Sequence, residues 1–594
     1  MNYKIWRSPY TRFGGLNSLC PDDRTDETLT AENVYTDAEL RQIAGQGFNA
    51  IWVHGVLANM TRLPQFPEFG CHADEHIAAM TRLIGHAAQF GLKVLLYCQP
   101  VRSVAAGNTA FWEKHAGCAG QHELATEQVI PKHMDEELEM ICLCTSAPPV
   151  KSWVQDAAAQ IAEKLPGLAG VILITSSEYP GHCYSHRTKR NPTQWSPLIE
   201  CPRCREREPY EIAAELIQLV RDGIRRHSGS MDIIAWNWGW TTWLKSPCRE
   251  ILDLLPRDVI VMACCERGGF MDLAERPHHP VNEYSLVYGG PSELCRELLA
   301  AAEALGHRTM TKLQLGTTHE LADVVGLPLL NSIFAKAAWH RAHPDTGFMG
   351  CWNCGNLTGA NPAAFNFFLR KDCPDEKNAA LKAFAEMYFP GCRSELLIAA
   401  WQDFQDACFY FPFAIPFLYR GVQTVALAYS EIFRMEELHG TPFGCSYLPK
   451  ADRGDDLTGG FTMQPHEFSL DELIGHLGKL AVLWQRGVER MRAALAGCDE
   501  RHELGNAVIC GCIWQSSENI YRAWRLRRDW DDSRKAEMLH ILRTELEVEK
   551  TALPWVEKDE RQGWHGEACV RFFDPGSIRR KIAFLEKQLA EFNV

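Results

Sequence analysis

Short apolar runs alternate along the first part of the chain with stretches in which apolar residues recur every three or four positions. The run that begins at Gly170 is typical: Val171 to Thr175 are apolar or β-branched, and the polar Ser176, Ser177 and Glu178 follow. Such a run suits a strand that is buried on both faces, as in a parallel sheet. Eight runs of this kind predict strands at Lys4–Arg12, Phe48–His54, Leu92–Gln99, Gly170–Glu178, Asp232–Trp238, Val259–Glu266, His307–Leu315 and Gly347–Trp352.

Helical periodicity fills most of the intervals between these strands, and one helix is expected from about Thr36. The other helices are predicted at Asp74–Phe90, Val150–Leu165, Tyr210–His227, Arg249–Leu255, Ser292–Leu305 and Leu329–His343. Repeated alternation of strand and helix implies a parallel sheet with right-handed crossovers. No GxGxxG or GxxxxGK[ST] signature follows a strand, which counts against a doubly wound sheet. The pattern therefore predicts an α/β fold of the (β/α)8 TIM-barrel type.

From about Ala363 strand signals fade and helical patterns dominate. We expect a barrel domain over residues 1–360 and a mostly α-helical domain over residues 361–594, packed on the barrel. Its helices are predicted at Lys377–Tyr388, Arg393–Cys408, Val422–Leu438, Leu470–Ala496, Ser533–Lys550 and Ser577–Phe592. Gln515–Asn519 and Trp524–Trp530 are interpreted as a polar-aromatic patch within this helical region.

The amino-acid composition limits the kinds of molecule that the protein is expected to bind. The 594 residues carry a net charge of −14 without a basic run, which excludes a nucleic-acid surface of the usual kind. No apolar run reaches membrane-spanning length and no secretion signal opens the chain, so we expect a cytoplasmic protein with no membrane contact. The 23 cysteines are then expected to be reduced thiols. Self-association into a homo-oligomer stays open.

Polar residues and tryptophans stand at the carboxyl ends of successive predicted strands, where barrel enzymes bind their ligands. Hydrogen-bonding groups beside tryptophan faces suit a sugar, whose ring packs on an aromatic surface. The residues expected to bind an oligosaccharide or glycoside are Arg12, His54, Trp236, Trp238, Glu266, Lys312, Gln314, His319 and Trp352.

Two carboxyl groups on either side of one bond are what glycoside hydrolysis requires. Glu178 follows an apolar strand between neutral neighbours, which favours the raised pKa that a proton donor needs. Glu320, after the seventh predicted strand, and Glu266, after the sixth, are the candidates for its partner. We predict Glu178 and Glu320 as the catalytic pair, with no cofactor required.

A glutamate after strand four and another after strand seven resembles the clan A retaining glycoside hydrolases, over the barrel only. The resemblance implies that Glu178 is the acid/base and Glu320 the nucleophile. Ser177 stands where that clan has asparagine. The chain is also similar to family 20 hexosaminidases, in which an aspartate before the acid orients the substrate's own acetamido group. Ser177 occupies the position of that aspartate.

The connection after Glu178 contains a CxxC motif, Cys201 to Cys204, with Cys183 and His186 upstream. Two thiolates at this spacing supply half of a tetrahedral zinc site, and Cys183 with His186 can complete it. Reduced free thiols and a redox role are the alternatives. A closed site of this kind would hold a long loop together and would not hydrolyse substrate.

The sequence therefore predicts a glycoside hydrolase that acts on the non-reducing end of a glycan, because long loops and a helical appendage more often enclose a pocket than leave an open cleft. The alternatives are a carbohydrate-binding barrel without catalysis and an N-acetylhexosaminidase that uses substrate-assisted catalysis. A metal-dependent barrel hydrolase is disfavoured because no HxH follows the first strand.

Overall fold

The computed structural model describes residues 2–11, 26–125, 138–177, 181–185, 187–189, 198–353, 356–434, 468–528, 530–567 and 569–592. The chain forms two compact units, each of which is discontinuous in sequence. Unit 1 comprises Met1–Cys265, Ser292–Leu313 and Pro344–Gly350. Unit 2 comprises Glu266–Pro291, Gln314–His343 and Cys351–Val594.

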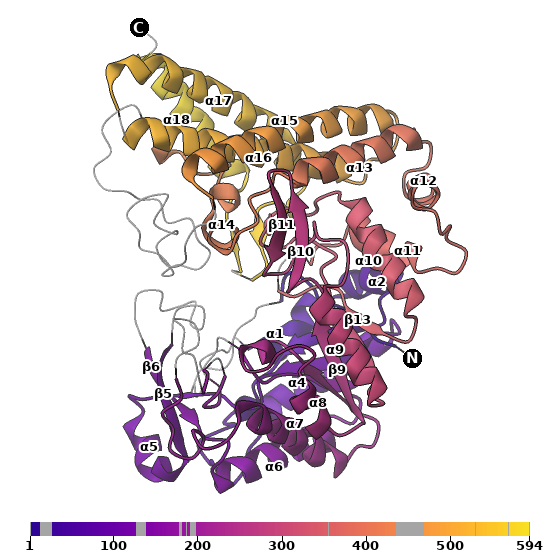
Figure 1. Cartoon of the computed structure of the whole chain (residues 1–594), viewed down its shortest axis with the longest axis vertical. Coiled ribbons are helices and arrows are strands. Elements are labelled where there is room, and N and C mark those ends of the chain that lie inside the picture. The colour runs from indigo at the N-terminus through magenta and orange to yellow at the C-terminus, as the bar shows by residue number, and fades with distance from the viewer. Residues whose placement is uncertain are drawn as a thin grey trace. The chain divides into compact units, whose positions relative to one another are not determined.

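Unit 1 contains a closed barrel of eight parallel strands, as the sequence predicts (Figure 1). Around the barrel the strands follow the order β1-β13-β12-β9-β8-β7-β3-β2. Their bounds are β1 Lys4–Trp6, β2 Ala50–His54, β3 Lys93–Cys98, β7 Gly170–Ile174, β8 Asp232–Trp236, β9 Val259–Cys264, β12 Thr309–Lys312 and β13 Gly347–Met349. Each lies within one of the eight predicted runs, so the predicted fold class is confirmed.

The barrel strands β7 and β9 are apolar along their whole length because both of their faces are covered. Every residue of β7 and of β9 is buried. The register sets Ile172 beside Ile234 and Ala235 beside Val261, so apolar side chains of neighbouring strands lie next to one another. Parallel strands with both faces covered read as continuous apolar runs rather than as alternating patterns.

Helices of unit 1 follow most of the strands. They are α1 Glu27–Val34, α2 Asp37–Gly45, α3 Leu57–Met60, α4 Ala73–Ala88, α5 Thr109–His115, α6 Pro148–Lys164, α7 Pro209–Arg225, α8 Arg249–Leu254 and α9 Glu293–Ala304. Helix α7 starts with Pro209 and a capping box between Glu208 and Glu211, which satisfies backbone N–H groups at its first turn.

Between β3 and α6 the chain makes an antiparallel three-stranded sheet, which was not predicted from the sequence. Its order is β4-β6-β5, with β4 Val104–Ala105, β5 Ala119–Ala125 and β6 Leu138–Leu143. This insertion follows the carboxyl end of a barrel strand, which is the side of a barrel where functional loops gather.

Unit 2 is mostly helical. Its α-helices are α10 Leu330–Ala342, α11 Ala360–Phe368, α12 Lys377–Tyr388, α13 Ser394–Cys408, α14 Ile415–Arg420, α15 Leu470–Ala494, α16 Glu503–Arg528, α17 Lys535–Lys558 and α18 Pro575–Phe592. The long helices α15 to α18 pack each against the next (Figure 1). Two hairpins complete the unit, formed by β10 Gly269–Leu273 with β11 Arg276–Val281 and by β14 Trp564–His565 with β15 Val570–Arg571.

The predicted helical C-terminal region is confirmed, with two local corrections. The predicted helix Val422–Leu438 was wrong up to residue 434, where 3-10 turns occur at Val422–Thr424 and Glu431–Phe433; its last residues lie outside the described ranges. Gln515–Asn519 belongs to α16, a helix that the sequence pattern did not predict. None of the described helices is long and apolar enough to cross a membrane.

Candidate functional site

The carboxyl ends of β1, β2 and β3 carry a buried cluster of charged and polar side chains. Arg7 follows β1, and its two terminal nitrogens donate to the two carboxylate oxygens of Glu27 at 2.7 and 2.8 Å. The guanidinium carbon of Arg7 lies 3.9 Å from the ring centroid of Trp52. His54 ends β2, and its Nε2 accepts a hydrogen bond of 2.9 Å from Arg102, which follows β3. His54 was predicted from the sequence, whereas the pair of Arg7 and Glu27 was not.

Burial raises the pKa of Glu27 to about 7, although Arg7 acts in the opposite direction. A carboxyl group with a pKa near neutrality can exchange a proton under ordinary conditions. Both oxygens of Glu27 are engaged by Arg7, however, so its first task is to hold α1 against the start of the barrel.

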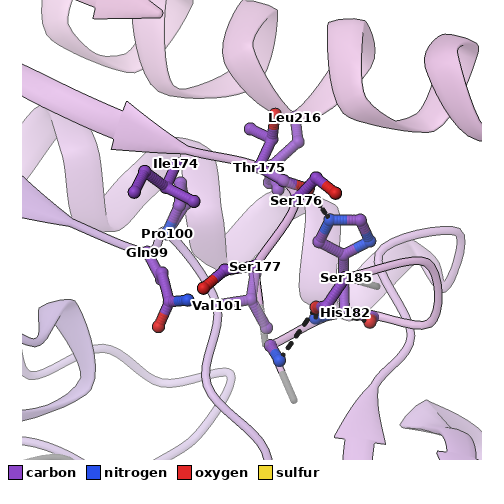
Figure 2. Close-up of a pocket in the computed structure, with 11 residues that line it drawn as sticks. Gln99, Pro100, Val101, Ile174, Thr175, Ser176, Ser177, His182, Ser185 and Leu216 are labelled. Atoms are coloured by element: carbon purple, nitrogen blue, oxygen red, sulfur yellow. Dashed lines mark hydrogen bonds between the residues drawn. The ribbon is translucent and has the colours of Figure 1, made fainter. Parts of the chain in front are cut away.

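The end of β7 encloses a small cavity (Figure 2). Its lining includes Gln99, Ser176, Ser177, His182 and Ser185, and its volume of about 10 Å³ has room for roughly one water molecule. The His182 side chain turns back toward the strand in Figure 2, and its Nε2 donates to the carbonyl of Thr175 at 2.6 Å. Burial lowers the pKa of His182 to about 4, so this imidazole is neutral at physiological pH.

The chain just beyond β7 folds back on itself. The backbone N–H of Ser177 donates to the carbonyl of Ser185 at 2.7 Å. Predicted acid Glu178 is the next residue after Ser177, and both it and Arg12 lie outside the described residues.

The ends of β8, β9 and β12 continue the ring of strand-end residues. Trp236 ends β8, is fully buried and donates to the sulfur of Cys264 at 3.2 Å, while Trp238 is half-buried. Lys312 ends β12 and is buried, and its carbonyl accepts from Cys265 N–H at 2.8 Å. These contacts join neighbouring strand ends within unit 1.

Gly239, in the turn after β8, touches the end of β7. Its φ is +77°, and a Cβ there would lie 2.2 Å from Ser176 Oγ. Both the backbone conformation and the lack of space require glycine. The end of β7 is therefore held by β8 on one side and by the turn at His182 on the other.

The predicted partner carboxylates lie in unit 2 and carry many hydrogen bonds. Glu320 accepts from Ser285 Oγ at 2.6 Å, from Leu286 N at 2.9 Å and from Thr318 Oγ1 at 3.2 Å. Burial raises the pKa of Glu320. These contacts make Glu320 an organiser of the segment around Ser285, and its catalytic role stays a prediction.

Glu266 forms a buried ion pair with a residue that the sequence did not suggest. Its Oε1 accepts from Lys336 Nζ at 2.6 Å and from Gln314 N at 2.9 Å. Lys336 also donates to the carbonyls of Ser285 and Gln314. Lys336 belongs to α10 between apolar neighbours, and a lysine inside an apolar helical stripe was the signal available.

The remaining sequence-predicted residues are spread over unit 2. Gln314 is buried and donates to the carbonyl of Thr317 at 2.9 Å. His319 lies 3.7 Å from the carboxylate of Glu567, and Trp352 is half-buried. Their roles in sugar binding stay predictions.

A four-cysteine cluster lies beside the β4-β6-β5 sheet of unit 1. Cys144, Cys183, Cys201 and Cys204 are all buried, and their sulfurs lie within 4.8 Å of one another. The Sγ of Cys144 is 3.8 Å from that of Cys201 and 3.6 Å from that of Cys204. Tetrahedral zinc with Zn–S bonds of about 2.3 Å requires sulfurs about 3.8 Å apart. The cluster can therefore hold a metal ion such as zinc with little rearrangement.

Backbone hydrogen bonds and two neighbouring side chains surround the four sulfurs. The CxxC turn is closed by Cys204 N donating to Cys201 O at 3.2 Å and by Arg205 N donating to the same oxygen at 2.9 Å. Ser146 Oγ lies 3.4 Å from Cys204 Sγ. Although burial opposes it, the charges of Cys144 and Cys201 raise the pKa of the Arg203 guanidinium.

The sequence identified three of these four thiols. Cys144, the fourth, was missed because it precedes Cys183 by a whole helix and strand. His186, the predicted fourth ligand, lies outside the described residues. Cys144 directly follows β6, and only the folding of that sheet onto the connection after β7 brings it to the cluster.

No model of a protein family and no curated protein matches this chain. Similar solved structures include a GH138 enzyme targeting pectin rhamnogalacturonan II, with 10% identity and a TM-score of 0.47 over 99% of this chain. The chain spans 66% of that enzyme's length, just under two thirds.

Two other similar structures match a smaller part of this chain. A Bacteroidetes-affiliated GH5 cellulase has 11% identity and a TM-score of 0.38 over 65% of this chain and 95% of its own. An α-amylase from Geobacillus thermoleovorans, complexed with acarbose, has 13% identity and a TM-score of 0.31 over 63% of this chain and 76% of its own. The chain is thus distantly similar to TIM-barrel glycoside hydrolases, without assignment to one of their families.

Proposed function

We propose that the protein is a glycoside hydrolase in which Glu178 is the proton donor. The observation that supports this most is the end of β7, the fourth strand along the barrel sequence. Hydrogen bonds from Ser177 and His182 and the close approach of Gly239 fix this strand end in a polar setting. Glu178 comes next in the chain, and barrel enzymes gather their catalytic residues at the carboxyl ends of the strands.

In the proposed reaction the carboxyl proton of Glu178 passes to the glycosidic oxygen as the bond from that oxygen to the anomeric carbon breaks. A second carboxylate either attacks the anomeric carbon or takes a proton from the attacking water. Glu320 is the proposed second carboxylate. The other residues proposed to contact the sugar are Arg12, His54, Trp236, Trp238, Glu266, Lys312, Gln314, His319 and Trp352.

The proposed substrate is the non-reducing end of a glycan. Long connections follow β3, β7 and β9 at their carboxyl ends, and one of them carries the inserted β4-β6-β5 sheet. Connections of this length favour a pocket over an open cleft. Release of single sugars from a reduced oligosaccharide would support this part of the proposal, and release of internal fragments would contradict it.

We also propose that the ion of the four-cysteine cluster is zinc. Four thiolates in tetrahedral arrangement are typical of structural zinc sites, which leave no position for water. The ion would then have no part in bond cleavage.

The test of the proposed acid is hydrolysis of a disaccharide and of the matching aryl glycoside by wild type and Glu178→Gln. Loss of general acid catalysis should lower kcat on the disaccharide by about 10²–10⁴-fold. The aryl glycoside should lose less, because a phenolate leaves with little protonation. Glu206→Gln, an exposed carboxylate in the same connection, is the matched control and should retain wild-type activity. Equal losses on both substrates would contradict the role of Glu178 as acid.

Glu320 needs a test that does not depend on mutation, because its replacement would also free Ser285 and Leu286. A 2-deoxy-2-fluoro glycoside with a good leaving group traps the covalent intermediate of a retaining glycosidase on its nucleophile. Peptide mapping should then find the label on Glu320. A label on another carboxylate would identify that residue as the nucleophile in place of Glu320.

A further inference from the structure

We propose that the zinc ion of the four-cysteine cluster fixes the turn Gly181–Ser185 against the end of β7 and thereby sets the position of Glu178. This inference rests on the proposed function of Glu178. It assigns the metal a part in the activity although the ion never touches substrate.

The four ligands come from two separate segments of the chain. Cys144 follows β6, whereas Cys183, Cys201 and Cys204 belong to the connection between β7 and α7. A bond to all four sulfurs ties that connection to the inserted sheet. Closing a long loop in this way removes much of the conformational freedom of the chain between the ligands.

One of the ligands lies inside the turn that abuts the catalytic strand. Cys183 is between His182, whose Nε2 donates to Thr175 O, and Ser185, whose carbonyl accepts from Ser177 N. Ser185 Oγ accepts from the N–H groups of Gly181 and His182 at 3.0 Å each, which keeps the turn compact. A constraint on Cys183 is therefore passed through one turn to the backbone of Ser177, next to Glu178.

Zinc would hold this arrangement by bonding to all four sulfurs at once. Loss of zinc would remove these bonds, and each ligand would then be free to move. Cys183 is on a short turn, so its departure would release Ser185 from Ser177.

The surroundings of the sulfurs fit a built site. Gly120, in β5, faces the cluster, and a Cβ at Gly120 would lie 2.5 Å from Cys183 Sγ. Arg203 donates to the carbonyl of Ala119 at 2.9 Å, which holds its positive charge beside the cluster. The sheet thus leaves the space that the sulfur of Cys183 occupies.

The experiment compares wild type with Cys144→Ser, which removes the ligand farthest in sequence from Glu178. Cys118→Ser is the matched control, because Cys118 is a buried thiol beside the cluster and outside the four. Three quantities are measured: zinc per chain by elemental mass spectrometry, hydrogen exchange of the amides of Ser177 and Ser185, and kcat and KM on the disaccharide.

Wild type and Cys118→Ser should bind one zinc per chain, and Cys144→Ser should lose it. In Cys144→Ser the amides of Ser177 and Ser185 should exchange at least about tenfold faster, while those of β2 stay protected. kcat should fall by about 10–100-fold with a smaller change in KM, since misplacement of a catalytic group by about 1 Å has effects of this size. Chelation of zinc from folded wild type should reproduce these changes, and added zinc should reverse them.

Two results would overturn the inference: wild type without a bound metal ion, or loss of zinc that leaves Ser177 and Ser185 protected. Neither would touch the proposed acid, which Glu178→Gln tests separately. Zinc-dependent protection in a protein that cleaves no glycoside would support the zinc-held turn and contradict the proposed function.

Discussion

Each unit buries a cluster of ionisable side chains, and the two clusters balance their charge differently. In unit 2, Lys581 of α18 lies 2.7 Å from a Glu549 oxygen and also contacts Glu545, and both glutamates belong to α17. Ser516 and Asn519 of α16 donate to Glu545 at 2.5 and 2.8 Å. The helical cluster therefore contains its own cation and its own hydrogen-bond donors.

The four-cysteine cluster of unit 1 gathers groups that become negative and includes no cation among its four members. Arg203 lies beside it but donates to backbone carbonyls. A buried cluster whose positive and negative side chains balance one another indicates a structural role. A buried cluster of side chains that carry the same charge indicates a binding site for an ion of opposite charge. The same criterion makes the pair of Arg7 with Glu27 structural.

The largest effect that this comparison predicts is that of removing the cation of the helical cluster. Lys581→Met leaves Glu545 and Glu549 buried without their partner, and breaking a buried ion pair costs about 3–5 kcal/mol. Urea denaturation followed by helical circular dichroism should show this loss in the free energy of unfolding.

Lys587→Met, on the same helix, is the control for this prediction. Lys587 is exposed and lies 3.7 Å from Glu591, so its loss should change stability by less than about 0.5 kcal/mol. If Lys581→Met were as stable as this control, the helical cluster would not depend on the charge of Lys581. The proposed difference between the two clusters would then be contradicted.

Sequence predicted the barrel well because parallel strands carry their signal locally. All eight strands lie inside predicted runs, and α12 has the predicted bounds. A strand such as β9 is apolar throughout, so its identity does not depend on which neighbours it meets.

Features that depend on contacts distant in sequence were missed. Helix α16 was not predicted because Ser516, Ser517 and Asn519 interrupt its apolar pattern; in the structure all three are buried, and Ser516 and Asn519 are satisfied by Glu545. Cys144 joins its cluster through a sheet whose pairing no local pattern reveals. Of the site, sequence identified the types of residue at the strand ends but not their partners.

The second largest effect is expected from a substitution that fills the space beside the sulfur of Cys183. Gly120→Ala would set a methyl group 2.5 Å from Cys183 Sγ and 2.9 Å from Cys142 O. Overpacking of this kind typically costs about 1–3 kcal/mol. The variant should lose zinc to a competing chelator at lower chelator concentration than wild type.

Gly117→Ala is the control, because a Cβ at Gly117 meets nothing within 4 Å. It should hold zinc as wild type does. Equal zinc retention by the two alanine variants would mean that the sulfur of Cys183 is not confined by β5.

The smallest effect predicted is a pH dependence of the helical cluster. Burial raises the pKa of Glu549 to about 8, against the opposing effect of Lys581, and Glu545 adds to the rise. Cys512, whose own pKa burial raises, is a further titratable neighbour. With Glu549 protonated, the positive charge of Lys581 and the negative charge of Glu545 balance each other. The four-cysteine cluster has no such balance of charge among its members.

The sign follows from proton binding in the two states. In the unfolded chain Glu549 ionises near its ordinary value of 4.5, but in the folded protein it keeps its proton until about pH 8. Its contribution to stability is therefore complete below pH 4.5 and is lost as the pH rises to about 8. Glu549→Gln stays neutral in both states, so the stability of wild type relative to this variant should decline over that range. Urea denaturation of both proteins across this range measures the difference. A constant difference would mean that Glu549 is ionised in the folded protein, leaving one Lys581 with two carboxylates and a cluster whose charge does not close.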